Sequence, residues 1–297
     1  MIELQCISMQ KNYKKRGIFK MKKFFALIAA GMMAVTMTGC GGSTAPATTD
    51  KATDKTANLV ELEDMVASGK MTIGYTLINP LNYFDSQTNE LVGFETEFAK
   101  AVCEKLGVEA VFQEIDWDSK EIELNSKNID CIWNGMTITP EREETMSISV
   151  PYMENRQVII VKAENADKYR ESFDGANVVA EQGSAGEELV QGDESFASAK
   201  YTAVASQATA LMEVSSGTAD VAVIDYTMAG GSVGEGTDYA DLVFVDKGYE
   251  SESYGIAFRK GSDVTNKVNE IISELAADGT IGKIAEKYGL SDLILVK

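Results

Sequence analysis

Strand and helix patterns alternate along the chain, and this alternation limits the folds that it can adopt. Apolar runs of strand length are separated by stretches whose apolar residues recur at helical spacing. In the first half we predict strands over 71–77, 108–115 and 130–133, and helices over 94–106 and 121–126. Because parallel strands need crossover connections, which are usually helices, the pattern predicts an α/β fold with mostly parallel sheets.

The second half of the chain continues the alternation. Strands are predicted over 157–161, 177–180 and 246–258, and two helices within 264–288, split at Gly279. Ser184 and Glu187 have the spacing of a capping box at the start of another helix. The C-terminal helices carry apolar residues that can pack on the first half: Ile271, Ile272, Leu275, Ile281 and Ile284.

Two segments of the chain resemble each other. SKNIDCIWNGMT begins at Ser126 and SGTADVAVIDYT at Ser216, and they share Ser, Asp and Thr at the same offsets. Each leads through an aspartate, Asp130 or Asp220, into an apolar strand. The repeat predicts two structurally similar α/β lobes. Ligands of such sheets bind beyond the carboxyl ends of the strands.

The composition excludes several classes of function. The chain has no histidine, which removes histidine bases, histidine-containing triads and histidine metal ligands. Its acidic residues are spread along the sequence and do not follow a calcium-loop spacing, so we predict neither a metal site nor a cofactor. A formal net charge of −19 argues against nucleic acid or an anionic membrane surface as a partner.

The N-terminal residues have the features of a bacterial export signal. Lys22 and Lys23 precede an apolar run over 24–35, and the segment Met-Thr-Gly-Cys ends at Cys40. This segment resembles a lipobox, in which Cys40 would be lipidated. The apolar run is too short to be a transmembrane anchor across a bilayer core of about 30 Å.

Two further cysteines, Cys103 and Cys131, fall in a predicted helix and a predicted strand. One pair does not make a disulfide framework in a chain of this length. We therefore predict two buried thiols.

The segment NGMTITPER, from Asn134 to Arg142, places a cation where a helix begins. Thr139 is a favourable N-cap and Pro140 suits the first helical position, so Arg142 falls in the first turn. A positive charge there opposes the helix dipole, at a cost of about 0.3 kcal/mol or more. An anion bound by the guanidinium and backbone N–H groups would offset this cost. The segment therefore indicates an anion site.

From about Leu59 to Leu290 the chain resembles the extracellular solute-binding proteins of polar amino-acid ABC importers (family 3 type), in their lipoprotein form. The matching segments follow the family's order, and the block around TITPER is the most specific: LVGFETEFAKAVCEKLGV, IDWD, NIDCIWNGMTITPEREETMSISVPY, AEQGSAG, ADVAVID, YGIAFRKGS and LAADGTIGKIAEKYG. The resemblance implies a two-lobe periplasmic-binding-protein fold (type II). Each lobe would be a mostly parallel sheet flanked by helices, and two hinge strands would let the lobes close over one amino acid.

This organisation gives the expected boundaries along the chain. The hinge strands are expected at both ends of the second lobe. We predict a leader and signal peptide over 1–39 with the true start at Met21, a lipidated flexible tether over 40–57, a first lobe over 58–153 and 255–297, and a second lobe over 154–254.

The resemblance also implies how the ligand is bound. An α-amino acid presents a carboxylate and an ammonium group, which need fixed opposite charges at a matching separation. Arg142 would hold the carboxylate, helped by its own backbone N–H and that of Thr137, and Asp225 would hold the ammonium group. Acceptors would come from the Gly135 carbonyl and the Thr137 hydroxyl. The remaining ligand-binding candidates are Trp117, Asn134, Tyr75, Ile78, Ser184, Ala185 and Glu181.

Several of these residues have a plainer interpretation. Arg142 could be a surface arginine paired with Glu143 or Glu144, and Asp225 could cap a turn. Trp117 could belong to the core, as most tryptophans do, and the capping role alone would explain Ser184.

Glu181 departs from the family pattern, because some relatives have a lysine there. It could make the pocket prefer a polar or cationic side chain. An exposed carboxylate on an already acidic protein is the interpretation that the sequence favours.

The expected partners are a polar L-amino acid, the permease subunits of an ABC importer, and the membrane through the lipid on Cys40. We expect a monomer, exported to the outer face of the bacterial cell membrane or to the periplasm, and not an enzyme. Two alternatives remain open: an enzyme acting on a small amino or carboxylic acid, for which Glu181 is the obvious acid–base candidate, and an amino-acid sensor domain.

Overall fold

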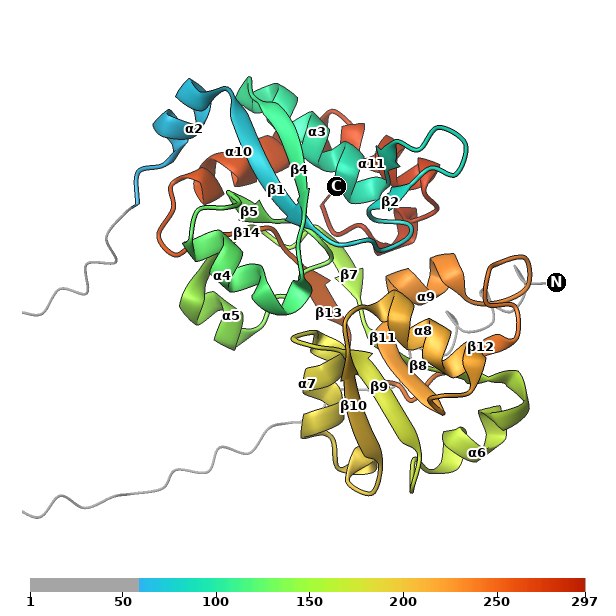
Figure 1. Cartoon of the computed structure of the whole chain (residues 1–297). Helices are drawn as coiled ribbons and strands as arrows, with labels where there is room; N and C mark the ends of the chain where they lie inside the picture. Colours follow the sequence, from blue (N-terminus) through green and yellow to red (C-terminus); the bar gives the residue numbers. More distant parts are fainter. Residues whose placement is uncertain (1–58, 297) are drawn as a thin grey trace, which may run out of the picture. The chain divides into compact units, whose positions relative to one another are not determined.

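Two five-stranded sheets organise residues 59–296, the part of the chain that the computed structural model describes (Figure 1). The first sheet has the strand order β4-β1-β5-β14-β6 and the second β10-β9-β11-β8-β12. In each sheet the strand in fourth place, β14 or β8, runs antiparallel to both neighbours, and the other four share one direction. The predicted α/β class with mostly parallel sheets is confirmed. The predicted signal peptide, Cys40 and the tether lie outside the described residues.

The strand bounds show how the chain passes between the sheets. The first sheet consists of β1 (Lys70–Tyr75), β4 (Glu109–Glu114), β5 (Cys131–Ile132), β6 (Met146–Ile148) and β14 (Ala257–Arg259). The second consists of β8 (Gln157–Lys162), β9 (Asn177–Glu181), β10 (Lys200–Val204), β11 (Val221–Asp225) and β12 (Leu242–Val245). Two short antiparallel pairs complete the strands: β7 (Met153–Asn155) with β13 (Glu252–Tyr254), and β2 (Tyr83–Phe84) with β3 (Leu91–Val92). Figure 1 shows β7 and β13 where the chain crosses between the two sheets.

Helices cover both sheets. They are α2 (Leu62–Ser68), α3 (Phe94–Leu106), α4 (Lys120–Asn125), α5 (Pro140–Thr145), α6 (Ala166–Glu171), α7 (Ala185–Gly192), α8 (Gln207–Ser216), α9 (Tyr226–Ser232), α10 (Val264–Ala277) and α11 (Thr280–Lys287). The predicted helix over 94–106 has these bounds and stops at Gly107, whose φ of 74° suits glycine. The predicted split at Gly279 is also confirmed, because α10 ends just before it and α11 begins just after it. No helix among residues 59–296 combines the length and apolar character needed to span a membrane.

The sequence repeat has a structural counterpart in the two sheets. Asp130 exchanges two hydrogen bonds with Thr72 at the start of β1: its backbone N–H donates to the Thr72 carbonyl, and its Oδ2 accepts from the Thr72 N–H at 2.7 Å. Asp220 does the same with Asn177 at the start of β9, and its Oδ2 accepts from the Asn177 N–H at 2.8 Å. Together with the matching strand orders, these contacts confirm the prediction of two similar lobes.

One predicted strand is wrong. The segment 246–258 was expected to be continuous, but the chain forms β13 and β14 there with different partners: β13 pairs with β7, and β14 with β5 and β6. The break lies at Gly255, where a Cβ atom would stand 2.5 Å from the side chain of Ile148. A strand pattern in the sequence cannot reveal a change of strand partner. The strand β12, directly before the segment, was not predicted.

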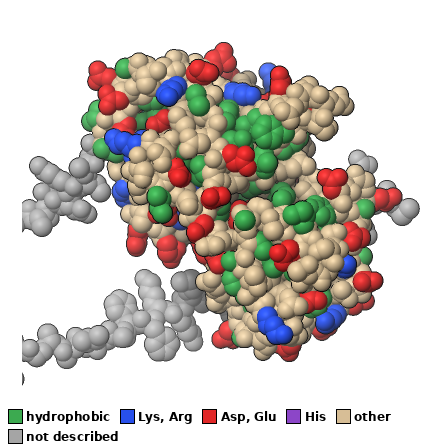
Figure 2. Space-filling view, in the orientation of Figure 1, with side chains coloured by type: hydrophobic (Ala, Val, Ile, Leu, Met, Phe, Trp, Pro, Cys, Tyr) green, Lys and Arg blue, Asp and Glu red, His purple; other side chains and the backbone are tan. Residues whose placement is uncertain are grey.

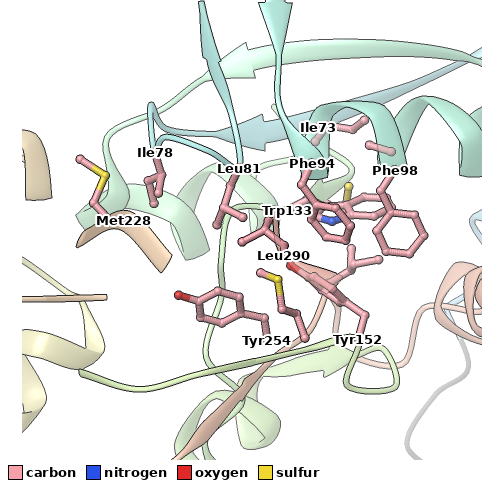
Figure 3. Packing of buried hydrophobic residues seen from close by; sticks show 14 of the residues in the cluster. Ile73, Ile78, Leu81, Phe94, Phe98, Trp133, Tyr152, Met228, Tyr254 and Leu290 are labelled. Atoms are coloured by element: carbon pink, nitrogen blue, oxygen red, sulfur yellow. The ribbon is translucent and has the colours of Figure 1, made fainter. Parts of the chain in front are cut away.

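The main hydrophobic cluster extends through both lobes, and one part of it lies between the first sheet, α3 and the C-terminal helices. The rings of Phe94, Phe98, Trp133 and Tyr152 gather there (Figure 3), and Phe98 meets Trp133 edge to face at a centroid distance of 5.0 Å. Both C-terminal helices contact α3. The predicted packing residues Ile271, Ile272, Leu275 and Ile281 are buried in this core, and Ile284 packs against it. Cys103 and Cys131 are buried free thiols, as predicted.

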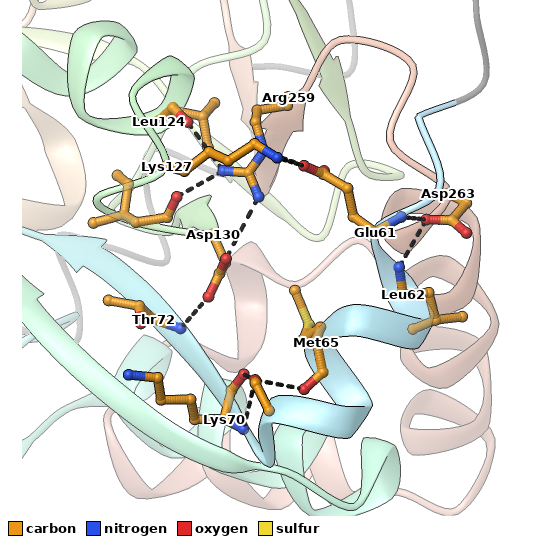
Figure 4. A network of polar contacts seen from close by, with 12 residues as sticks. Glu61, Leu62, Met65, Lys70, Thr72, Leu124, Lys127, Asp130, Arg259 and Asp263 are labelled. Atoms are coloured by element: carbon orange, nitrogen blue, oxygen red, sulfur yellow. Dashed lines mark hydrogen bonds and ion pairs between the residues drawn. The ribbon is translucent and has the colours of Figure 1, made fainter.

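A buried arginine ties the start of the described chain to the first sheet (Figure 4). The Arg259 side chain donates from Nε to Glu61 Oε1 at 2.5 Å and from Nη1 to the carbonyls of Leu124 and Ile129 at 3.0 and 2.8 Å. Its Nη2 donates to Asp130 Oδ1 at 3.4 Å. The guanidinium therefore links the N-cap residue of α2, the end of α4 and Asp130, which directly precedes β5.

We expect Arg259→Ala to lower the free energy of unfolding by about 3 kcal/mol, because the buried Glu61 carboxylate loses its hydrogen-bonded cation and keeps only the exposed Lys127 at 3.8 Å. Urea denaturation of the two proteins measures the difference. Lys267→Ala is the matched control, since Lys267 pairs with Glu270 on an exposed helix face. It should cost about 0.5 kcal/mol or less. Equal effects of the two substitutions would contradict a structural role for Arg259.

Candidate ligand-binding site

A cavity lies where the carboxyl ends of the two sheets face each other. Its lining from the first lobe is Ile78, Trp117, Asn134, Gly135, Thr137 and Arg142, and from the second lobe Glu181, Ser184, Ala185, Gln207 and Asp225. Glu181 ends β9 and Asp225 ends β11, while the Asn134–Gly135 turn follows β5. This is the edge at which α/β sheets bind ligands.

Arg142 reaches the cavity from the first turn of α5. Thr139 is the N-cap and Pro140 the first helical residue, as predicted, and the backbone N–H of Arg142 donates to Thr139 Oγ1. That N–H is therefore occupied by the cap and does not serve the anion site as expected. The guanidinium is buried and donates to the Thr137 carbonyl at 2.9 Å. Its Nη2 pairs with Glu188 of α7 at 2.9 Å, so the alternative of a surface arginine paired with its sequence neighbours is wrong.

Asp225 is a buried carboxylate surrounded by side-chain amides. Its Oδ1 accepts from Asn155 Nδ2 and from Gln157 Nε2, both at 2.7 Å, and its Oδ2 accepts from Gln207 Nε2. The carboxylate makes no capping bond to α9, so the plainer interpretation as a turn cap is wrong. Burial raises the pKa of Asp225, and the amide hydrogen bonds oppose that shift.

Glu181 corrects the interpretation that the sequence favoured. Its side chain is 3% exposed and faces the cavity, because the end of β9 lies beneath the first lobe. It forms no ion pair with any lysine or arginine among residues 59–296. Burial, followed by the nearby charge of Asp225, raises the pKa of Glu181 to about 8. A cation entering the cavity would therefore find an unpaired carboxyl group.

Lys120, which the sequence did not point to, lies beside Trp117 at the cavity. Its ammonium group lies 4.7 Å from the centre of the Trp117 ring and donates to the Trp117 carbonyl. It also donates across to the Gly183 carbonyl of the second lobe at 3.0 Å. Burial, and then the charge of Arg142, lowers the pKa of Lys120 to about 8.

Several contacts join the lobes around the cavity. The Gly183 carbonyl accepts from Lys120 and, at 3.4 Å, from Arg142 Nη2. Gln182 Nε2 donates to Asp118 Oδ2 at 3.1 Å, and Asn79 Nδ2 donates to the Gly231 carbonyl at the same distance. The described arrangement is therefore a closed one.

A polar network behind the cavity holds the Asn134–Gly135 turn. Gly135 has a φ of 55°, and its N–H donates to the buried carboxylate of Glu95 at 2.8 Å. Tyr152 Oη and Asn82 Nδ2 donate to the same carboxylate. Asn134 Nδ2 donates to Thr76 Oγ1 at 2.6 Å. Burial raises the pKa of Glu95 to about 7 although these donors oppose the shift.

Ten of the eleven predicted ligand-binding residues line the cavity. The exception is Tyr75, which is buried and meets Phe112 edge to face at a centroid distance of 6.0 Å. Three further residues of the site were not predicted: Gln207, which lines the cavity, and Asn155 and Gln157, which hold Asp225. Their positions at the start of α8 and at the ends of β7 and β8 carry no distinctive motif.

The described residues hold no metal-like cluster of three or more histidine, cysteine, aspartate or glutamate side chains. Acidic side chains are spread over the face that Figure 2 shows, with fewer basic ones between them. This agrees with the net charge of −19.

Solved structures with the same fold are known. A substrate-binding protein of an ABC uptake transporter from Streptococcus pneumoniae, with bound histidine, is 27% identical with a TM-score of 0.71, and the match covers 79% of this chain and 98% of that one. The ancestral amino acid-binding protein AncCDT-1, a precursor of cyclohexadienyl dehydratase, is 32% identical with a TM-score of 0.68, over 76% and 98% of the two chains. The predicted two-lobe periplasmic-binding-protein fold (type II) is confirmed.

Sequence comparison agrees with the fold. The arginine-binding extracellular protein ArtP of Bacillus subtilis (strain 168) is 29% identical over 272 residues, which are 90% of this chain and 98% of that protein. The model of the bacterial extracellular solute-binding proteins, family 3, matches residues 71–291. The chain belongs to this family of solute-binding proteins, as its motifs predicted.

Proposed function

We propose that the chain is a lipid-anchored receptor that captures a polar L-amino acid between its lobes and delivers it to an ABC importer. The observation that carries the proposal is the placement of Arg142 and Asp225 on opposite lobes around one cavity. A guanidinium is a strong partner for a carboxylate, and a buried carboxylate is a strong partner for an ammonium group. A zwitterion would bridge the two lobes and favour their closure by its higher affinity for the closed form.

Within this function, the charges favour a ligand with a cationic side chain. Arg142 and Asp225 account for the two α-substituents of an amino acid, and Glu181 is left as a second carboxyl group in the cavity. Because the pKa of Glu181 is about 8, its carboxyl group can stay protonated beside a neutral ligand and ionise beside a cationic one, which then gains a buried charged partner. The arginine specificity in the printed name of ArtP supports the same ligand class.

The N-terminal features support the anchored form. The lipobox-like segment ends at Cys40, and the tether predicted over 40–57 would separate the lipid from the lobes. We infer that the protein works as a monomer on the outer face of the cell membrane or in the periplasm, and that it meets its permease there. The lobe boundaries predicted at 153–154 and 254–255 place the hinge in β7 and β13.

An enzyme on the same fold is the second candidate. The observation in its favour is Glu181, a buried acid whose pKa of about 8 suits proton transfer near neutral pH. The likeness to AncCDT-1, a precursor of cyclohexadienyl dehydratase, agrees with this. Recovery of a bound small acid unchanged after long incubation with the protein would contradict the enzyme.

The first experiment is a melting-temperature screen of the common L-amino acids, after unfolding and refolding of the protein to remove carried ligand. A ligand at 100 times its Kd should add about 2.7 kcal/mol to the free energy of unfolding, which is visible as a higher melting temperature. We expect the shift to be confined to one or a few polar L-amino acids, arginine among them. Absence of any shift would contradict the receptor.

Arg142→Ala should abolish that shift and weaken binding by about 30-fold or more, because the ligand carboxylate loses a buried charged partner. Calorimetric titration measures the change in Kd. Arg170→Ala is the matched control, since Arg170 is exposed on α6, away from the cavity lining. An Arg142 variant that binds like the control would refute the assigned role.

Glu181→Gln should weaken binding of L-arginine about 10-fold or more and leave neutral ligands such as L-glutamine nearly unaffected, because only the cationic side chain loses a charged partner. The ratio of the two Kd values measures the preference. Glu194→Gln, an exposed change on the same lobe, controls for net charge. An unchanged ratio would show that Glu181 does not select the side chain.

A further inference from the structure

A second carboxylate lies beside Asp225, and the same two amide groups hold both. Asn155 Nδ2 donates to Asp225 Oδ1 at 2.7 Å and to Glu252 Oε1 at 2.5 Å. Gln157 Nε2 donates to the same two oxygens at 2.7 and 2.9 Å. Each amide group thus spends both of its hydrogens on this pair. The two amide groups therefore hold the carboxylates of Asp225 and Glu252 close together, and both carboxylates are mostly buried.

Glu252 stands at the junction of the two lobes. It lies on β13 directly opposite Asn155 of β7, and these are the two short strands where the chain crosses between the sheets. Its Oε1 also accepts from Thr137 Oγ1 of the first lobe at 3.1 Å. Asp225 and Gln157 belong to the second sheet. The carboxylate pair therefore contacts both lobes and the strands that connect them.

In the described part of the chain, the two carboxylates are held by amides and a hydroxyl and not by a cation. Neither Asp225 nor Glu252 forms an ion pair with a lysine or arginine within 59–296. The titratable groups that act on the pair from the neighbouring elements are Glu181 of β9, Glu95 of α3 and Tyr254 of β13. Of the cations at the cavity, Lys120 of α4 acts on Glu181. Burial, and then the charge of Asp225, raises the pKa of Glu252 to about 7.

Two carboxylates this close do not both ionise readily unless a cation joins them. We propose that Asp225 and Glu252 act as one ammonium subsite, which holds a proton while the cavity is empty and releases it to solvent when the α-ammonium group of the ligand binds. This inference rests on the proposed amino-acid receptor function. It adds Glu252 to the binding machinery, as a residue that sets the charge of Asp225 from the hinge.

The direction of the pH effect follows from linkage. The ligand-free site binds a proton more tightly than the ligand-bound site, so a fall in pH stabilises the empty form. Affinity for the amino acid should therefore fall as the pH drops below about 7, by up to tenfold per pH unit for one released proton. Glu252→Gln removes one of the two acids, so Asp225 no longer has a like charge beside it.

The test is calorimetric titration of the purified protein with L-arginine, and separately with L-glutamine, at pH 7 in phosphate and in Tris. These buffers differ in heat of ionisation, so the difference in observed heat gives the number of protons released. We expect about half a proton or more for the wild type, because a group whose pKa is near the working pH is about half protonated. Glu252→Gln should release fewer protons than the wild type with either ligand, and far fewer with L-glutamine, which brings no side-chain cation to Glu181. With L-glutamine the variant should also show a flatter dependence of Kd on pH from 6 to 8. Glu181→Gln and Glu95→Gln should still release protons from the Asp225–Glu252 pair.

A ligand-free measurement checks the shared proton separately. A carboxyl group whose pKa is raised on folding stabilises the protein at low pH, and this contribution is lost as the pH rises through about 7. Because the pKa of Glu252 rises from 4.5 to about 7 on folding, the melting temperature of the wild type should fall relative to that of Glu252→Gln between pH 5 and pH 7. Parallel melting profiles would overturn the inference.

The outcomes separate this inference from the proposed function. Binding of an amino acid without proton release, or with equal release in Glu252→Gln, overturns the proton-sharing subsite and leaves the receptor function standing. Binding of neither probe, nor of any amino acid in the melting screen, overturns the receptor function and the ammonium subsite with it.

Discussion

Arg142 donates across the cavity to Glu188 and to the Gly183 carbonyl, and the rest of the site depends on how this buried cation is neutralised. A guanidinium that is 6% exposed must keep an anionic partner. In the closed arrangement Glu188 is that partner, and its own side chain is 55% exposed. Because the Glu188 carboxylate is already partly hydrated, its full return to water costs little free energy. An incoming ligand carboxylate can therefore replace Glu188 as the partner of Arg142. The Arg142–Glu188 pair thus neutralises the buried guanidinium while the cavity is empty, and it can be replaced when a ligand carboxylate binds.

The repeat explains why the opposite charges face each other. Gly135 and Asp225 occupy the same offset in the two repeated segments, and Thr137 and Thr227 another. Each segment ends a central strand of its own sheet, so equivalent positions meet at the cavity from two sides. The lobes differ in what they place there: the first offers a glycine turn and the arginine that follows it, the second a carboxylate. One folding pattern used twice therefore yields a site with two poles of opposite charge.

The sequence predicts much of this arrangement because the informative residues lie in continuous segments. The cap at Thr139, the helix stop at Gly107 and the strand that ends at Asp225 are local features, and the structure has them as expected. Glu181 was misjudged because the groups that act on it lie far away in the sequence: Asp225 and Gln207 in its own lobe and Lys120 in the other. Gln207 and Glu252 were missed for a similar reason: each acts on Asp225 from a different element, and no spacing in the chain records such a contact.

The place of Glu252 in the hinge links the charge of the site to closure. In the closed form both lobes shield the Asp225–Glu252 pair from water. A second negative charge without a cation therefore costs more free energy in the closed form than in the open form. Opening would admit water and reduce that cost, so ionisation of the empty pair favours the open form. A proton or an ammonium group removes the repulsion and favours closure. An amino acid carries both an ammonium group, which binds the Asp225–Glu252 pair, and a carboxylate, which can pair with Arg142 of the other lobe. A proton can bind only the carboxylate pair. The amino acid therefore stabilises the closed form more than a proton does. The closed form is therefore favoured more by bound amino acid than by low pH alone.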